Sequence, residues 1–310
     1  MINKKFLQFL GTILVVIFHL WFRLTGSVAE RFIVSISYIG VDLFFICSAY
    51  SLSRKEKIDY WPFVINRFKT VYFKFVVFTL VYAFILYTPS KYSPLPDILA
   101  RLIKFGTVIS GIELFTKGGG SFLWFVPAIM IFYFLFPLFI NWKNRYKSIL
   151  VLCGYIFISI IFQLLGYREL FIVLNRIPLI LVTYQLTVSK TDIGYLKGAI
   201  LTLTGLVLMY LFSFRMSLNV PFYDSCFLVA LPLCVGITAL VKNVKTNKVM
   251  DMIASASLEI YALQMMIGFK LVKTMVSLLS IPFIVNIAVI ASISLSGIII
   301  NRIFGLIIKR

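Results

Sequence analysis

The sequence predicts an all-α, polytopic transmembrane helical bundle with about ten membrane-spanning helices. Of its 310 residues, 61% are apolar and only 13% are charged, and the mean hydropathy is +1.01. Soluble domains carry about 45–50% apolar and about 25% charged residues. Stretches such as 122–140 and 149–165 lack charge over most of the ~20 helical residues that cross a bilayer. Because lipid offers the backbone no hydrogen-bond partners, these stretches are predicted to be helices.

Ten apolar segments are predicted to span the membrane. The first carries Lys4 and Lys5 before it but no small-residue cleavage site after it, so we expect a span rather than a signal peptide. The chain 1–310 is expected to be a single integral-membrane domain. In chain order the predicted spans are residues 6–23, 33–53, 70–88, 121–140, 148–166, 170–188, 197–214, 223–241, 251–270 and 282–301.

The formal charge of +19 raises the question of a nucleic-acid partner. With the N-terminus in the cytoplasm, however, the inner segments hold seventeen of the 30 Lys and Arg residues and the outer segments about ten. Basic residues near span ends favour the cytoplasmic side, so both termini are predicted to lie there. The charge then indicates topology and contact with membrane lipid, and no nucleic-acid partner is expected.

The longest segment between predicted spans is 89–120, which is predicted to be an outer loop. It contains Pro94, Pro96 and the run 118–120 of three glycines, and a short amphipathic stretch is predicted near 98–109. A lid, an acceptor-binding loop and a plain connector all fit this pattern.

His19 is the one histidine in the chain and lies in the first predicted span. It is the group best suited to act as a general base near pH 7, although a lone membrane histidine is often structural. Asp42 and Glu259 lie in the middle of predicted spans, where a carboxylate usually faces a partner or a cavity. A structural contact between helices is the alternative for each. Asp42 lies on the helix after His19, so we predict that it contacts and orients the imidazole.

A basic segment, 63–72, follows the second predicted span and contains Arg67 and Lys69. Such residues fit a phosphate site, but they also fit a positively charged inner face against anionic lipid. The four cysteines, Cys47, Cys153, Cys226 and Cys234, lie in apolar runs without metal-binding or redox spacing, so no metal site is predicted.

Several of these segments resemble the membrane-bound acyltransferase family 3. Residues 8–19 resemble its opening helix, whose signature is an arginine, ten residues and a histidine. Residues 39–48 are similar to its second-helix pattern of Gly-Val-Asp, large apolar residues and a serine, and residues 67–72 look like its basic inner segment. Residues 123–125 with Tyr133 and Pro137 resemble its Trp-aromatic helix, and 176–178 and 257–261 fall where related motifs recur.

The resemblance implies that an acyl group, commonly acetyl, passes from cytoplasmic acyl-CoA to a sugar hydroxyl on the outer side. The acceptor would be a bacterial surface glycan or lipid-linked saccharide, and the protein would lie in the bacterial inner (cytoplasmic) membrane. Acyl-CoA would be a co-substrate, with no permanently bound cofactor. The implied roles are catalysis by His19 and Asp42, acyl-CoA binding by Gln8, Arg67, Lys69 and Tyr72, and substrate binding by Trp124, Tyr133, Arg176, Glu259 and Tyr261.

This sequence departs from the family pattern at several positions. Gln8 replaces the signature arginine, Thr70 and Phe73 replace an arginine and a proline, and Gln264 stands where many members have histidine. Two alternatives therefore stay open. One is a transporter or flippase for a lipid-linked saccharide with Asp42, Glu259 and Arg176 along its path, and the other is a catalytically degenerate family member.

Overall fold

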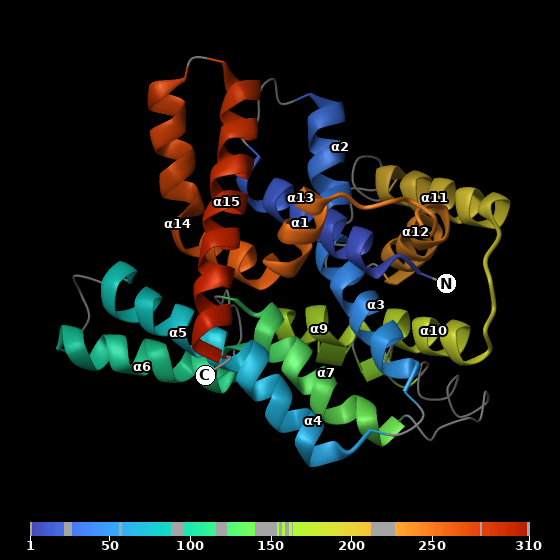
Figure 1. Ribbon diagram of the computed structural model, residues 1–310, viewed down its shortest axis with the longest axis horizontal. Coiled ribbons are helices and arrows are strands. Elements are labelled where there is room, and N and C mark those ends of the chain that lie inside the picture. Colours follow the sequence, from blue (N-terminus) through green and yellow to red (C-terminus); the bar gives the residue numbers. More distant parts are fainter. Residues whose placement is uncertain are drawn as a thin grey trace.

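The computed structural model describes residues 2–21, 27–55, 58–87, 96–115, 123–139, 154, 157–158, 161–162, 164–211, 227–279 and 281–308. These residues form helices and connecting turns, with no strand among them, which agrees with the predicted all-α class (Figure 1). The helices are α1 (Lys4–Leu20), α2 (Val28–Ser37), α3 (Gly40–Ser53), α4 (Tyr60–Arg67), α5 (Phe73–Val81), α6 (Asp97–Ser110), α7 (Phe125–Phe139), α9 (Arg168–Leu174), α10 (Ile177–Val188), α11 (Tyr195–Tyr210), α12 (Phe227–Leu240), α13 (Lys248–Ser255), α14 (Ser257–Leu278) and α15 (Pro282–Ile308).

Helices α1 and α3 cross at two glycines. A Cβ atom on Gly40 would lie 2.7 Å from the Gly11 carbonyl oxygen and 2.6 Å from Val15 Cγ2. Lipid gives helices no hydrophobic reason to associate, so close backbone approach at small residues is a main source of packing energy in membranes. Close backbone approach at glycines also occurs where α11 packs against α12, at Gly205 and Gly236.

The third predicted span begins earlier than the sequence indicated. The chain is helical without interruption from Tyr60 to Leu86, through α4, a π-helical turn at Phe68–Tyr72, α5 and a second π-helical turn at Tyr82–Leu86. The helix therefore begins ten residues before the predicted start of the span at residue 70. Arg and Lys are good helix formers, and hydropathy alone marked them as a boundary.

Helix α6 confirms the amphipathic helix predicted near 98–109. It packs back along α5, because Arg101 donates hydrogen bonds to the Ala83 and Phe84 carbonyls, each 3.1 Å away. Those carbonyls lie at the end of a helix, where intrahelical donors run out. The glycines at 118–120 lie outside the described residues, and the outer position of 89–120 stays a prediction.

Three of the predicted spans consist of two helices each. Helices α2 and α3 are separated at Tyr38 and Ile39, and α9 and α10 are separated at Asn175 and Arg176. Helices α13 and α14 meet at Ala256 with a bend of 65°. These breaks place new helix N-termini within the bundle.

Among the described residues, four helical stretches are long and apolar enough to cross a membrane, and two of them contain the breaks at Ile39 and Arg176. They are Val28–Ser53, Tyr60–Leu86, Leu170–Val188 and Pro282–Ile308. The bent pair α13 and α14 makes a fifth, and shorter apolar helices lie at Phe125–Pro137, Tyr195–Tyr210 and Val229–Leu240. Most of the predicted span 148–166 lies outside the described residues. The count of ten spans therefore stays a prediction.

The helix crossing at Gly40 gives a stability prediction. Gly40→Ala is expected to force α1 and α3 apart and to destabilise the fold by about 1–3 kcal/mol, as overpacking does. The matched control is Gly106→Ala in α6, where a Cβ meets nothing within 4 Å. This control is expected to leave the melting temperature unchanged or slightly raised. Thermal unfolding in detergent measures both, and equal melting temperatures for the two variants would show that the crossing is loose.

Candidate active site

The helix breaks position the ionisable side chains of the interior. Asp42 lies in the first turn of α3, Glu259 lies in the first turn of α14, and Arg176 immediately precedes α10. The first turn of a helix has free N–H groups and a partial positive charge, which stabilises a carboxylate there. The breaks therefore help to stabilise the two carboxylates in the interior of the bundle.

Asp42 and Arg176 form a buried ion pair. Arg176 Nε lies 3.0 Å from Asp42 Oδ1, and both side chains are only 3% exposed. The guanidinium also donates to the Ile172 carbonyl at 3.1 Å and lies over the rings of Tyr38, at 4.9 Å, and Trp124, at 5.8 Å. The structure thus unites three of the residues predicted for the site.

His19 is half-buried near the C-terminal end of α1, and its Nδ1 lies 3.0 Å from the Val15 carbonyl oxygen. A carbonyl oxygen only accepts hydrogen bonds, so Nδ1 carries the proton in the neutral ring and the lone pair remains on Nε2. The imidazole lies edge-on to Phe18 at 5.0 Å, and Phe18 contacts Tyr38 at 5.5 Å. The Tyr38 ring in turn contacts the Arg176 guanidinium. The rings of Phe18 and Tyr38 therefore connect His19 with the ion pair.

The predicted contact between Asp42 and His19 is not made. Asp42 is paired with Arg176 instead, and the imidazole is oriented by the carbonyl of its own helix. Sequence reasoning placed Asp42 on the neighbouring helix correctly but had no means of detecting an arginine from a distant helix as the better partner. A guanidinium offers a carboxylate both charge and several donors, which an imidazole does not.

Glu259 belongs to a second buried cluster. Its Oε1 accepts a hydrogen bond from Lys74, whose ammonium group also donates to Asn301 Oδ1 at 3.1 Å and lies 5.6 Å from the Phe304 ring. Glu259 is fully buried, so Lys74 neutralises a carboxylate that water does not reach. The site prediction missed Lys74, although a single lysine within the apolar run 73–81 was a usable signal.

Aromatic rings connect the ion pair with α14. Trp124 contacts Phe125 at 6.4 Å, and Phe125 contacts Tyr261 at 5.6 Å. One turn further along α14, Gln264 is fully buried, and neither of its amide atoms has a hydrogen-bond partner among the described residues. Gln264 was recognised in the sequence only as a departure from a family pattern, and its burial identifies it as a further interior polar group.

Arg67 and Tyr133 lie together on the side of the bundle formed by α4 and α7. The Arg67 guanidinium lies 4.8 Å from the Tyr133 ring and 5.1 Å from the Phe63 ring, and the Tyr133 hydroxyl lies 3.1 Å from Ser48 Oγ. Lys69 is exposed.

Gln8 and Tyr72 are not brought to the same place. The Tyr72 hydroxyl donates to the Ile109 carbonyl of α6 at 2.5 Å. Gln8 is half-buried on α1, where its backbone carbonyl accepts a hydrogen bond from the Thr12 hydroxyl. The four residues predicted for acyl-CoA binding therefore do not form one cluster.

The described part of the chain contains no group of three or more His, Cys, Asp or Glu side chains that could hold a metal ion. Cys47 and Cys234 are buried free thiols, and Cys153 and Cys226 lie outside the described residues.

The apolar spanning helices and the buried ionic residues at helix breaks define a multi-pass membrane protein. A family model described as an acyltransferase domain matches residues 5–302, which is nearly the whole chain. The chain therefore belongs to acyltransferase family 3, and it is a membrane acyltransferase. Neither the curated proteins nor the solved structures that were compared with the chain gave a match.

The ion pair gives the second prediction. Asp42→Asn leaves Arg176 as a buried charge without a carboxylate, and such a change costs about 3–5 kcal/mol. The double variant Asp42→Leu with Arg176→Met removes both charges and is expected to recover most of the loss, as apolar replacements of buried ion pairs do. Thermal unfolding and expression level in membranes measure both.

The control is Asp251→Asn, which breaks the ion pair between Asp251 and Lys5. The Lys5 side chain is 61% exposed and the Asp251 side chain is 34% exposed. This variant is expected to unfold close to the unmodified protein, because exposed ion pairs contribute little. An Asp42→Asn protein as stable as this control would show that the buried pair is not a structural element.

Proposed function

We propose that this protein is an O-acyltransferase that uses acyl-CoA, with acetyl the expected acyl group, to acylate a hydroxyl of a bacterial surface polysaccharide or its lipid-linked precursor. The observation that carries the proposal is the half-buried imidazole of His19, whose Nδ1 is bonded to the Val15 carbonyl so that the lone pair of the neutral ring lies on Nε2. Family membership supports acyl transfer, and the donor, the acceptor and the bacterial cytoplasmic membrane are parts of the proposal.

In the proposed reaction, His19 Nε2 accepts the proton of the sugar hydroxyl as the oxygen attacks the thioester carbonyl. The tetrahedral intermediate then collapses, the C–S bond breaks, and the CoA thiolate leaves. The imidazolium returns its proton to that thiolate, so one ester and one free thiol form and the histidine is regenerated. Its Nδ1–H bond to Val15 persists throughout, since the proton on Nδ1 is not transferred.

We assign Asp42 and Arg176 an electrostatic role. The guanidinium is a permanent cation in a water-poor interior, where a fixed charge stabilises a developing oxyanion more than it does in water. Asp42 then acts as a positioning residue that holds Arg176 between Tyr38 and Trp124. Tyr261 and Tyr133 are proposed to line the path of the substrates, and Glu259 is proposed to support this region through its pair with Lys74.

The proposal includes the predicted topology, with ten spans and both termini in the cytoplasm. Contacts support the relative placement of segments assigned to the inner side. Asn3 donates to the Val244 carbonyl, Lys5 pairs with Asp251, and Lys242 pairs with Asp192. Helices α3, α10 and α12, whose spans are predicted to run in the same direction, also bring their C-terminal ends to one cavity.

Replacing His19 gives the third prediction. His19→Ala and His19→Gln are both expected to lower the rate of acyl transfer by about 10²–10⁴-fold, the usual contribution of a general base. Glutamine retains hydrogen-bonding atoms but has no basic nitrogen, so it separates proton transfer from packing. The measurement is consumption of labelled acyl-CoA by purified protein with a glycan acceptor, and Gly106→Ala is the control that keeps its rate.

The same assay separates the alternatives. A transporter for a lipid-linked saccharide would move its substrate without consuming acyl-CoA. A degenerate family member, which Gln8 in place of the signature arginine brings into consideration, would bind donor without turnover. Retention of acyl transfer in both His19 variants, with inserted protein at normal levels, would contradict the proposed mechanism.

A further inference from the structure

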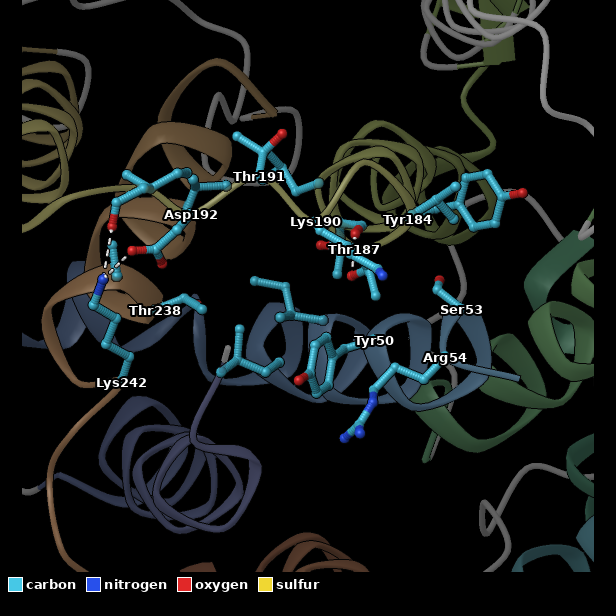
Figure 2. Close-up of a pocket in the computed structure, with 18 of the residues that line it drawn as sticks. Tyr50, Ser53, Arg54, Tyr184, Thr187, Lys190, Thr191, Asp192, Thr238 and Lys242 are labelled. Carbon is cyan, nitrogen blue, oxygen red and sulfur yellow. Dashed lines mark hydrogen bonds and ion pairs between the residues drawn. The ribbon is translucent and has the colours of Figure 1, made fainter. Parts of the chain in front are cut away.

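A cavity of about 900 Å³ opens between the C-terminal ends of α3, α10 and α12. Ile46, Tyr50 and Arg54 line it from α3, Thr183 and Thr187 line it from α10, and Thr238 lines it from α12. Figure 2 shows Tyr50, Thr187 and Thr238 around one space, with Lys190 beside Thr187 and Arg54 below Tyr50. Its volume lies at the upper end of the range for small-molecule sites, which is about 300–1,000 Å³.

The cavity and the ion pair lie along the same two helices. Asp42 and Arg176 join the N-terminal ends of α3 and α10, and the cavity separates the C-terminal ends, so the two helices run parallel. On α3 the cavity begins at Ile46, one helical turn from Asp42, and extends to Arg54. Twelve residues of helix from Asp42 to Arg54 span ~18 Å. A long ligand seated here would therefore point one end toward the ion pair.

Polarity changes along the cavity. Its buried part includes Ile46, Thr183 and Ala239, which are 2%, 6% and 6% exposed. Its exposed part carries the cations Arg54, Lys55 and Lys190. The inner hydroxyls of Thr183, Thr187 and Thr238 all donate to carbonyls of their own helices. The buried part of the cavity is therefore lined by neutral side chains, and the exposed mouth is the part that attracts an anion.

Among the described residues that line the mouth, cations outnumber anions. Lys242 pairs with Asp192 at 2.6 Å, and this hydrogen bond lowers the pKa of the Asp192 carboxyl, so that pair is neutral. Arg54, Lys55 and Lys190 remain, with three positive charges. Each of the three helix C-terminal ends supplies about half a negative charge. About half of the cationic charge is therefore left to meet an anion.

We infer that this cavity is the entry site of the phosphorylated acyl donor, with the phosphates at Arg54, Lys55 and Lys190 and the neutral arm along Ile46 and Thr183 toward Asp42 and Arg176. The ligand class is an adenosine bisphosphate or diphosphate joined to a long uncharged arm. This inference rests on the proposed function for the identity of the donor, although binding itself requires no turnover.

The inference moves the donor phosphates away from the basic segment that the sequence suggested. Arg67 does not line the cavity, and its guanidinium lies over the rings of Phe63 and Tyr133. Lys69 does not line it either. Gln8 and Thr70, which stand where the family pattern has arginines, are then compatible with donor binding, because neither arginine is needed to hold the phosphates.

The test is binding of adenosine 3′,5′-bisphosphate, which carries no thioester, to purified protein in phosphatidylcholine nanodiscs. The double variant Arg54→Gln with Lys190→Gln is expected to raise Kd by about tenfold or more, since charge-assisted contacts to phosphate are lost. The matched control is Lys245→Gln with Lys248→Gln, which removes the same charge from exposed residues that do not line the cavity. Its Kd is expected to stay within about twofold, because exposed charges that do not line the cavity contribute little to binding in it.

A labelling measurement covers the case in which the double variant fails to fold. Lys190→Cys is expected to be protected from a maleimide by the bisphosphate, whereas Lys245→Cys is not. Equal loss of binding in both double variants, or loss with Arg67→Gln alone, would overturn the inference and leave the proposed function standing. Abolition of binding by added phosphatidylglycerol would assign the cavity to a lipid headgroup and would also overturn it. Failure of the proposed function appears separately, as intact bisphosphate binding without acyl-CoA consumption.

Discussion

The arrangement of this bundle depends on placing charged side chains where lipid and apolar side chains surround them. Asp42 and Glu259 each begin a helix, and each has a cation as its partner, Arg176 for one and Lys74 for the other. A continuous helix would offer these carboxylates no free N–H groups, so the breaks and the ion pairs act together. The breaks in turn fix where α3, α10 and α14 start, and so where the aromatic rings between them lie.

The cavity and the ion pair occupy opposite ends of the pair α3 and α10. In the proposed function this geometry separates two tasks, with recognition of the donor phosphates at the exposed end and acyl transfer at the buried end. His19 lies on α1, which crosses α3 at Gly11 and Gly40, next to the turn that carries Asp42. The crossing at Gly11 and Gly40 therefore sets the distance between His19 and the ion pair. The same contact that stabilises the packing of α1 on α3 also positions the proposed base.

Much of the fold was predictable, because hydropathy reports which segments avoid water. The all-α class and the amphipathic helix near 98–109 were predicted correctly, and His19, Asp42, Trp124 and Arg176 were all recognised from the sequence. The helix breaks at Ile39, Arg176 and Ala256 were not predicted, since a break in an apolar segment leaves the mean hydropathy unchanged. The Asp42 to Arg176 pairing was also missed, because the two residues are far apart in sequence and no periodicity links them. Lys74 could have been singled out as a lone lysine in an apolar run, but its pairing with Glu259, far away in sequence, could not. The cavity depends on tertiary packing alone.

The central claim is that the half-buried imidazole of His19 presents Nε2 as its basic atom. The chain has a single histidine, so protein labelled with ¹⁵N-histidine gives the two nitrogen resonances of His19 without overlap. The account predicts a neutral ring at pH 7 that is protonated at Nδ1, with the Nε2 resonance shifting when acceptor binds. A ring protonated at Nε2 would contradict it, because the hydrogen bond to Val15 and the proton transfer both require the opposite tautomer.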